Sequence, residues 1–96
     1  MNTAFLLMAK YDAAVIPLET VARDYFAPLT PTKLAQKIQN GEIALPIYRS
    51  DMNSQKSAKG VALVDLAEWI DRGIAAGRKE CEALTGVRFG TSWDQK

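Results

Sequence analysis

The chain has 96 residues, of which 48% are hydrophobic and 24% are charged, which suits one small domain with a single core. It has no histidine and a single cysteine, Cys81, which argues against a structural zinc site, a Ser-His or Cys-His catalytic pair and an internal disulfide. No apolar run reaches the roughly 18 residues of a membrane span, and AFLLMA lacks the basic flank of a signal peptide. We therefore expect a cytoplasmic protein with no catalytic residues, no metal site and no cofactor.

The net charge of +1 is unevenly distributed along the chain. Residues 30–60 carry five basic and two acidic side chains, a net charge of +3, whereas residues 61–85 carry three basic and five acidic side chains, a net charge of −2. A basic patch on a nearly neutral chain is one form that a phosphate-binding surface takes. The alternative is an ordinary solvated surface, and charge alone does not decide between the two.

The first predicted helix covers residues 3–11, with Asn2 or Thr3 as its N-cap. Phe5, Met8 and Ala9 fall on one face at helical spacing. This much apolar surface predicts that the helix is buried against its own domain or against a second copy of the chain. Val15-Ile16-Pro17 then predicts a short extended segment, since the residue before a proline avoids the helical region.

The second predicted helix runs from Leu18 to Phe26, with Leu18, Val21 and Ala22 on its inner face and Pro28 just beyond its end. The third has clear local signals at both ends. Thr30 is a good N-cap, Pro31 suits the first helical position, and Gly41 follows the last residue, Gln39 or Asn40. Two such helices joined by a short turn form a helix-turn-helix candidate.

A β-hairpin is predicted next. Residues 43–49 contain β-forming residues around Pro46, which a strand tolerates only at a sheet edge. Residues 50–60 are polar and basic, and residues 61–63 read as the returning strand, so the hairpin has a long tip, or wing. Asp65 is the expected N-cap of a long helix that Thr85-Gly86 stops. Gly73 and Gly77 within it indicate a bend or the close approach of another chain.

The order of these elements is similar to the winged helix-turn-helix of the MerR and excisionase type, along PLETVARDYF, LTPTKLAQKIQNGEIALPIYR and KSAKGVALVDLAEWID. The chain also resembles the pyocin activator family in NTAFLLMAKY, AVIPLETVARDYF, LTPTKLAQKI, GEIALPI and SQKSAKGV. This second resemblance covers residues 1 to about 72. It implies sequence-specific DNA binding upstream of target promoters and activation of bacteriocin and prophage-type genes.

The expected fold is therefore mainly α with a small β-hairpin, a MerR/excisionase-like winged helix-turn-helix with an extra N-terminal helix and a long C-terminal helix. We expect one DNA-binding domain over residues 1–96. It divides into an N-terminal helix to residue 14, the helix-turn-helix and wing over 15–63, the C-terminal helix over 64–85 and a tail over 86–96.

The outer face of the third helix is the predicted base-reading surface. Side chains near the start of such a helix reach base edges in the major groove, and Gln or Asn pairs with adenine. The alternative is an ordinary solvated helix face. The residues predicted to contact DNA there are Thr30, Thr32, Lys33, Gln36, Lys37 and Asn40.

The wing is the predicted backbone-binding surface, because Lys and Arg neutralise phosphates and small residues let a loop approach closely. The alternative is a polar hairpin tip with no ligand. The residues predicted to contact DNA there are Arg49, Ser54, Gln55, Lys56, Ser57 and Lys59.

The leading hypothesis is a transcriptional activator and not an enzyme, located in the cytoplasm at the nucleoid. Its expected partners are double-stranded DNA, RNA polymerase and a second copy of the chain in a dimer, with no membrane partner. One candidate polymerase contact is the acidic surface of the last helix, formed by Glu68, Asp71, Glu80 and Glu82. Two alternatives remain: an excisionase-like architectural protein that bends DNA or assembles in tandem, and a protein-interaction module that has lost DNA binding.

Overall fold

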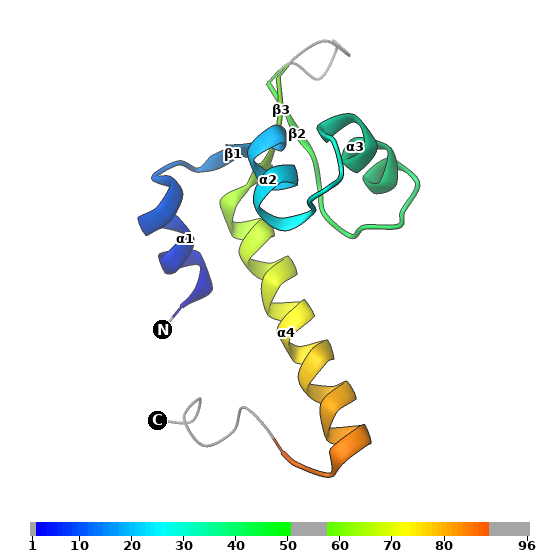
Figure 1. Cartoon of the computed structure of the whole chain (residues 1–96). Helices are drawn as coiled ribbons and strands as arrows, with labels where there is room; N and C mark the ends of the chain where they lie inside the picture. The colour runs from blue at the N-terminus through cyan, green and yellow to red at the C-terminus, as the bar shows by residue number, and fades with distance from the viewer. Residues whose placement is uncertain (1, 51–57, 89–96) are drawn as a thin grey trace.

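The computed structural model describes residues 2–50 and 58–88. Along the chain, the elements are α1 (Thr3–Tyr11), β1 (Val15–Pro17), α2 (Leu18–Tyr25), α3 (Pro31–Gln39), β2 (Tyr48–Arg49), β3 (Lys59–Ala62) and α4 (Leu63–Thr85). Figure 1 shows α1, α2, α3 and the strands gathered around the first turns of α4, whose remaining turns project away. The fold is mainly helical with a small antiparallel sheet and a long last helix. This confirms the predicted fold class and is consistent with a winged helix-turn-helix.

The three short strands form one antiparallel sheet in the order β1-β3-β2. The predicted hairpin corresponds to β2 and β3, and β1 adds a third strand with Ile16 opposite Val61. The strand predicted over residues 43–49 is wrong in length, because only Tyr48 and Arg49 pair with β3. Pro46 has no N–H to donate to a ladder, and the Leu45 N–H bonds locally to the Ile43 carbonyl at 3.0 Å.

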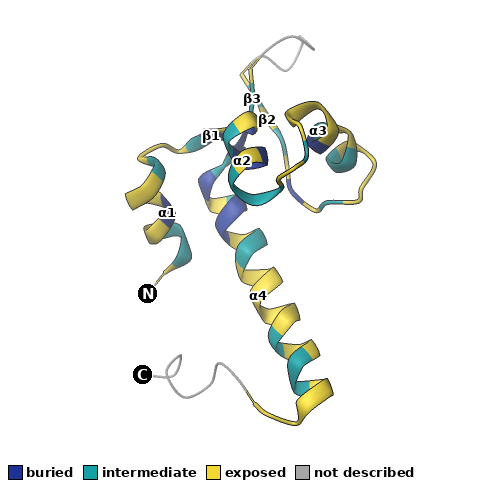
Figure 2. Ribbon diagram, in the orientation of Figure 1, coloured by how far each residue is buried: buried dark blue, intermediate teal, exposed yellow. Residues whose placement is uncertain are grey.

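The core draws one fully buried side chain from each of five elements: Ile16 from β1, Val21 from α2, Leu34 from α3, Val61 from β3 and Leu66 from α4. Figure 2 shows this buried zone where the helices meet above the middle of α4. Burying a large aliphatic side chain contributes roughly 1.5–3 kcal/mol. Contacts between elements distant in sequence therefore hold α3 and the hairpin in fixed relative positions.

Helix α1 is capped by Asn2, whose Oδ1 accepts the backbone N–H groups of Ala4 and Phe5, and it packs along α4. Its buried side chain is Leu7. Of the two alternatives for the Phe5 and Met8 face, burial in its own domain is wrong, since these side chains are 61% and 55% exposed. Burial against a second copy of the chain stays a prediction. A helix that is apolar nearly all round gives no sequence signal for which side faces the core.

Helix α4 begins at Leu63 and not after Asp65, so the predicted N-cap is wrong. The Leu63 N–H donates to the carbonyl of Ala14 at 2.8 Å, which ties the helix start to the segment before β1. Asp65 lies in the first turn, where the positive end of the helix dipole stabilises its negative charge. The helix stops at Thr85 with Gly86 in the left-handed region, as predicted. No helix in the described part of the chain is long and apolar enough to cross a membrane.

Candidate nucleic-acid interface

Helix α3 exposes a polar face because its opposite face is anchored in the core. Leu34 is fully buried, and Ala35 and Ile38 pack against the same core. The Thr30 Oγ1 accepts the backbone N–H of Lys33 at 3.2 Å, so the predicted N-cap is confirmed. The Thr30 hydroxyl keeps its own proton, which leaves it able to donate a hydrogen bond outward.

The turn after α3 brings two oppositely charged side chains together. Gly41 adopts a φ of +78°, which a residue without a Cβ tolerates, and the Glu42 N–H donates to the Lys37 carbonyl at 2.9 Å. The Lys37 Nζ then lies 3.2 Å from the Glu42 Oε1. The positive charge of Lys37 is therefore partly neutralised by Glu42. Lys33, by contrast, has no acidic partner among the described residues.

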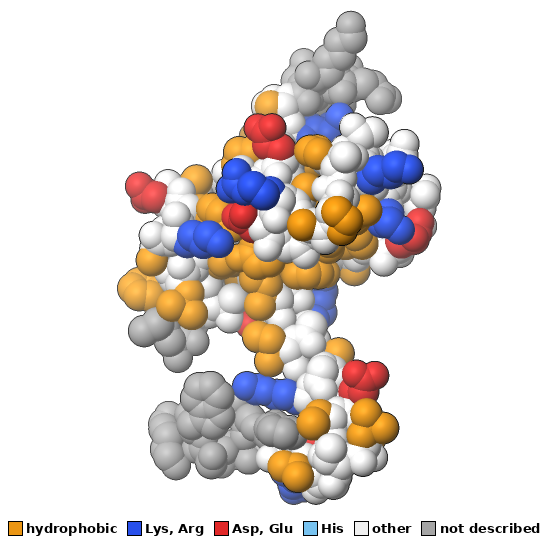
Figure 3. Space-filling view, in the orientation of Figure 1, with side chains coloured by type: hydrophobic (Ala, Val, Ile, Leu, Met, Phe, Trp, Pro, Cys, Tyr) orange, Lys and Arg blue, Asp and Glu red, His pale blue; other side chains and the backbone are white. Residues whose placement is uncertain are grey.

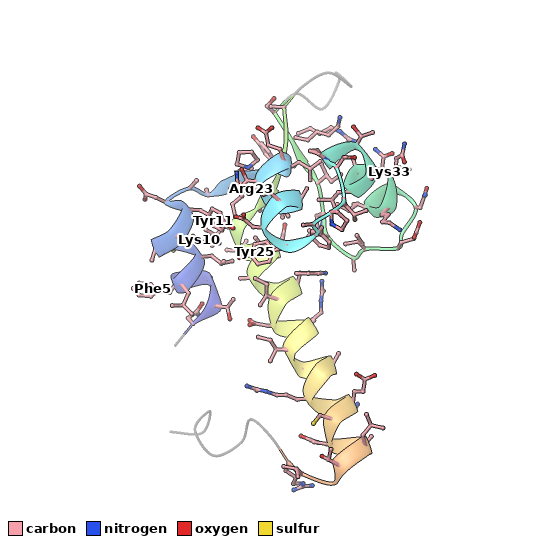
Figure 4. All side chains as sticks on the ribbon, viewed as in Figure 1. Phe5, Lys10, Tyr11, Arg23, Tyr25 and Lys33 are labelled. Carbon is pink, nitrogen blue, oxygen red and sulfur yellow. The ribbon has the colours of Figure 1, made fainter. Side chains whose placement is uncertain are left out.

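The outermost line of α3 consists of Lys33, Gln36 and Asn40, spaced by three and four residues and all exposed. On a helix with 3.6 residues per turn, this line lies opposite the buried Leu34 and the partly buried Ile38. Figure 4 shows Lys33 reaching away from the body of the molecule. A surface placed against this helix would therefore meet these three side chains first.

A groove of about 500 Å³ lies between the start of α2, α3 and the end of the hairpin. It brings three of the predicted contact residues together: Thr32, Gln36 and Lys59. Lys33, Lys37, Asn40 and Arg49 do not line it. Gln39 does line it and was not predicted, although its spacing of three from Gln36 and seven from Thr32 was a usable signal.

The hairpin stem pairs two cations. Arg49 of β2 lies directly opposite Lys59 of β3, and the Ser50 N–H donates to the Ala58 carbonyl at 3.1 Å. Directly opposed residues project from the same face of a strand pair, and two like charges there oppose pairing. The stem therefore concentrates positive charge. Four of the predicted wing residues lie outside the described residues: Ser54, Gln55, Lys56 and Ser57.

Close packing fixes the stem against β1. A Cβ added to Gly60 would lie 2.7 Å from both the Ile16 carbonyl oxygen and the Val15 Cγ1. Gly60 is paired on both sides, with Pro17 in β1 and Tyr48 in β2. The absence of a side chain at this position lets the three strands meet, which sets the position of the hairpin relative to α2.

A second charged cluster joins α1 to α2 (Figure 4). The Tyr11 hydroxyl donates to the Asp24 carboxylate at 2.6 Å, Arg23 Nε lies 3.0 Å from it and Lys10 Nζ 3.7 Å from it. The hydrogen bonds from Tyr11 and Arg23 hold the pKa of Asp24 below its usual value. Burial, and then the bond to Asp24, raises the pKa of Tyr11. This cluster attaches α1 to the helix-turn-helix.

Figure 3 shows Lys and Arg side chains spread over α1, α2 and α3 on the face turned to the viewer, with acidic side chains between them. In the part of the chain that the structure describes, no three His, Cys, Asp or Glu side chains gather as a metal site would require. The positive groups are thus dispersed over a broad surface that includes α3.

The comparisons with known proteins point to one family. The family model described as Pyocin activator protein PrtN matches residues 3–76, from the start of α1 into the middle of α4. No curated protein and no solved structure matches the chain. The matched residues include α2, α3, the sheet and both sides of the groove. The chain therefore belongs to the pyocin activator protein family.

Proposed function

We propose that this protein activates transcription of pyocin genes by binding double-stranded DNA upstream of their promoters. In this proposal, residues 1–96 act as one DNA-binding domain, with α3 in the major groove and the β2-β3 hairpin on the sugar-phosphate backbone. The observation that carries the proposal is the groove that Thr32 and Gln36 of α3 share with Lys59 of the hairpin. A helix and a basic hairpin on one surface can contact adjacent bases and phosphates together.

Helix α3 supplies the groups that base recognition requires. Gln36 and Asn40 each present an amide that can pair bidentately with adenine, and Lys33 can donate to guanine. Thr30 and Thr32, at the start of the helix, lie where hydroxyl and amide donors meet a phosphate. Lys37 supports the same surface from its side, although Glu42 competes for its charge.

Arg49 and Lys59 supply the backbone contact. Their opposed positions concentrate positive charge at the loop end of the hairpin stem, where Lys59 lines the groove. Each phosphate that such a cation neutralises releases counterions, which makes binding sensitive to salt. We include Ser54, Gln55, Lys56 and Ser57 in this contact on the basis of the sequence.

Activation also needs a surface that contacts RNA polymerase, or a change in promoter shape. The exposed acidic side chains of α4, among them Glu68 and Glu80, are our candidate for that contact. They belong to a different helix from the base-reading residues of α3, so DNA and polymerase would contact different elements.

The test compares two charge reversals, Lys33→Glu on α3 and Lys79→Glu on the projecting end of α4. Both side chains are exposed, and both changes alter the net charge equally. Selection of bound sequences from a random duplex pool first supplies the target. Lys33→Glu should then weaken duplex binding at least tenfold and lower the salt slope by about 1, while Lys79→Glu should change binding far less. Lys37 is a poorer probe, because a glutamate there would face Glu42.

Two results would contradict the proposal. Equal weakening of duplex binding by both reversals would mean that only net charge matters and that α3 makes no contact with the bases. A parent protein that binds no duplex at low salt would favour the protein-interaction module. Footprinting distinguishes an activator from an excisionase-like architectural protein. Several tandem sites beside a recombination end would indicate the architectural protein, whereas one compact site beside a promoter would indicate an activator.

A further inference from the structure

The apolar stripe of α4 extends well past the core. Leu63, Ala67 and Ile70 face the core at spacings of four and three. The same alternation continues through four more residues of the helix, Ile74, Gly77, Cys81 and Leu84. A repeat with a mean of 3.5 residues keeps one face in line along a helix. The distal stripe, defined as these last four residues, therefore lies on the same side of α4 as the core contacts.

The distal stripe is exposed at three of its four positions, and Cys81 is half-buried. Ile74 is 46% exposed and Leu84 is 81% exposed, and a Cβ added at Gly77 would meet no atom within 4 Å. Near the end of the packed turns, Asp71 accepts a hydrogen bond from Thr3, and Arg72 donates one to the Ala44 carbonyl. Figure 2 shows the turns beyond them largely exposed. An isolated helix of this length is marginal in water.

We propose that the distal stripe binds the distal stripe of a second copy of this chain, with the two α4 helices antiparallel and crossing near Lys79. This register is self-complementary. It places Ile74 against Leu84 of the second copy, and Gly77 against Cys81 of the second copy, on both sides of the two-fold axis. The two large side chains face each other, and the smallest residue faces a medium one, as knobs-into-holes packing requires.

The antiparallel direction follows from where the rest of the fold lies. The body of each chain packs on the stripe side of α4, through Leu63, Leu66 and Ala67. A parallel partner would bring its own body into the same space beside the same turns. An antiparallel partner places its body at the far end, and a crossing near Lys79 leaves residues 73–85 of each helix free to pair.

The contact is short, so we expect a weak dimer. Stable interfaces bury roughly 1,200–2,000 Å² in total, and about thirteen residues of two helices supply less. Association should therefore be of roughly micromolar affinity or weaker.

The first experiment places two glutamates on the stripe or beside it. Ile74→Glu with Leu84→Glu disrupts the proposed contact, and Ala75→Glu with Ala83→Glu adds the same charge on the other face of the same turns. Sedimentation equilibrium over a wide concentration range should show the parent and the Ala75/Ala83 variant dimerising alike. The Ile74/Leu84 variant should remain monomeric. Circular dichroism checks that both variants fold, which is expected because all four positions lie outside the core.

The second experiment measures direction. Cys81 is the sole cysteine, so a Cys81→Ser chain carrying Glu68→Cys accepts one spin label on an exposed position of α4. Residue 68 lies eleven residues before the proposed crossing. Two labels in an antiparallel dimer are then about 33 Å apart along the helix axis, whereas a parallel pair would hold them within about 20 Å. The shorter distance would overturn the proposed geometry.

Three other results would overturn the proposal. The parent could stay monomeric at every concentration reached, or both double variants could lose association equally. The third result would assign the stripe to the chain's own C-terminal tail. In that case Phe89→Ser with Trp93→Ser, made in the full chain, would turn a monomeric parent into a dimer. None of these outcomes depends on DNA binding, so this inference stands or falls separately from the proposed function.

Discussion

The two parts of α4 share one sequence pattern and lie in different surroundings. Up to Ile70 the apolar stripe is covered by α1, α2 and the sheet, whereas from Gly73 to Thr85, the projecting half, it faces outward. Periodicity thus predicts a helix and the side of it that is apolar. It does not predict what covers that side. The covered part is stabilised by tertiary burial, and the projecting half depends on helix propensity and the Gly86 C-cap.

The largest effect should come from shortening one leucine in each part. Leu66 is fully buried, so Leu66→Ala should lower the free energy of unfolding by about 2–5 kcal/mol through lost transfer energy and a cavity. Leu84 is 81% exposed, so Leu84→Ala should change it by less than about 0.5 kcal/mol in dilute solution. Urea unfolding followed by circular dichroism measures both. Comparable losses would mean that Leu84 is buried in the dilute protein.

The next effect contrasts a crowded glycine with an open one. Gly60→Ala forces a Cβ to within 2.7 Å of the Ile16 backbone, so it should cost about 1–3 kcal/mol of stability. It should also displace the hairpin stem and weaken DNA binding. Gly77→Ala, with no atom within 4 Å of the new Cβ, should cost nothing in the monomer. If Gly60→Ala is neutral in thermal unfolding, β1 and β3 are farther apart than the structure shows.

Local signals explain how well the third helix was predicted. Thr30, Pro31 and Gly41 act through their nearest neighbours, so the boundaries of α3 could be read from the sequence. Other features depend on distant residues. The start of α4 is set by a hydrogen bond to Ala14, and the buried side of α1 by its contact with α4. Neither feature can therefore be predicted from the residues of its own segment.

The candidate site divides in the same way. The polar residues of α3 were predictable because the helix period separates them from Leu34 and Ile38. Their pairing with the hairpin was not, since the groove depends on how α2, α3 and β3 pack. Likewise, the opposition of Arg49 and Lys59 depends on strand register, and the ion pair between Lys37 and Glu42 on the turn at Gly41.

A smaller effect tests how firmly α1 is attached to the packed part of the molecule. Tyr11→Phe removes the hydrogen bond to Asp24 and should cost at most about 1 kcal/mol near neutral pH. Because the pKa of Tyr11 is raised on folding, its contribution is complete below pH 10 or so and declines as the pH rises further. The lowered pKa of Asp24 gives stability that is lost as the pH falls below about 4. Thermal unfolding against pH should show both declines in the parent, and Tyr11→Phe should remove the alkaline one.

The smallest effect on global stability should come from Gly73→Ala, at the start of the projecting half. No atom lies within 4 Å of the new Cβ, so the change acts through helix propensity and favours the local helix by up to about 1 kcal/mol. If the projecting half opens on its own, amide exchange in the turns that follow should slow by up to about fivefold while the urea midpoint hardly moves. A matching rise in the urea midpoint would mean that α4 unfolds as one unit. The projecting half would then be as stable as the packed half despite its exposure. The two halves would differ only in how much of their apolar surface is exposed.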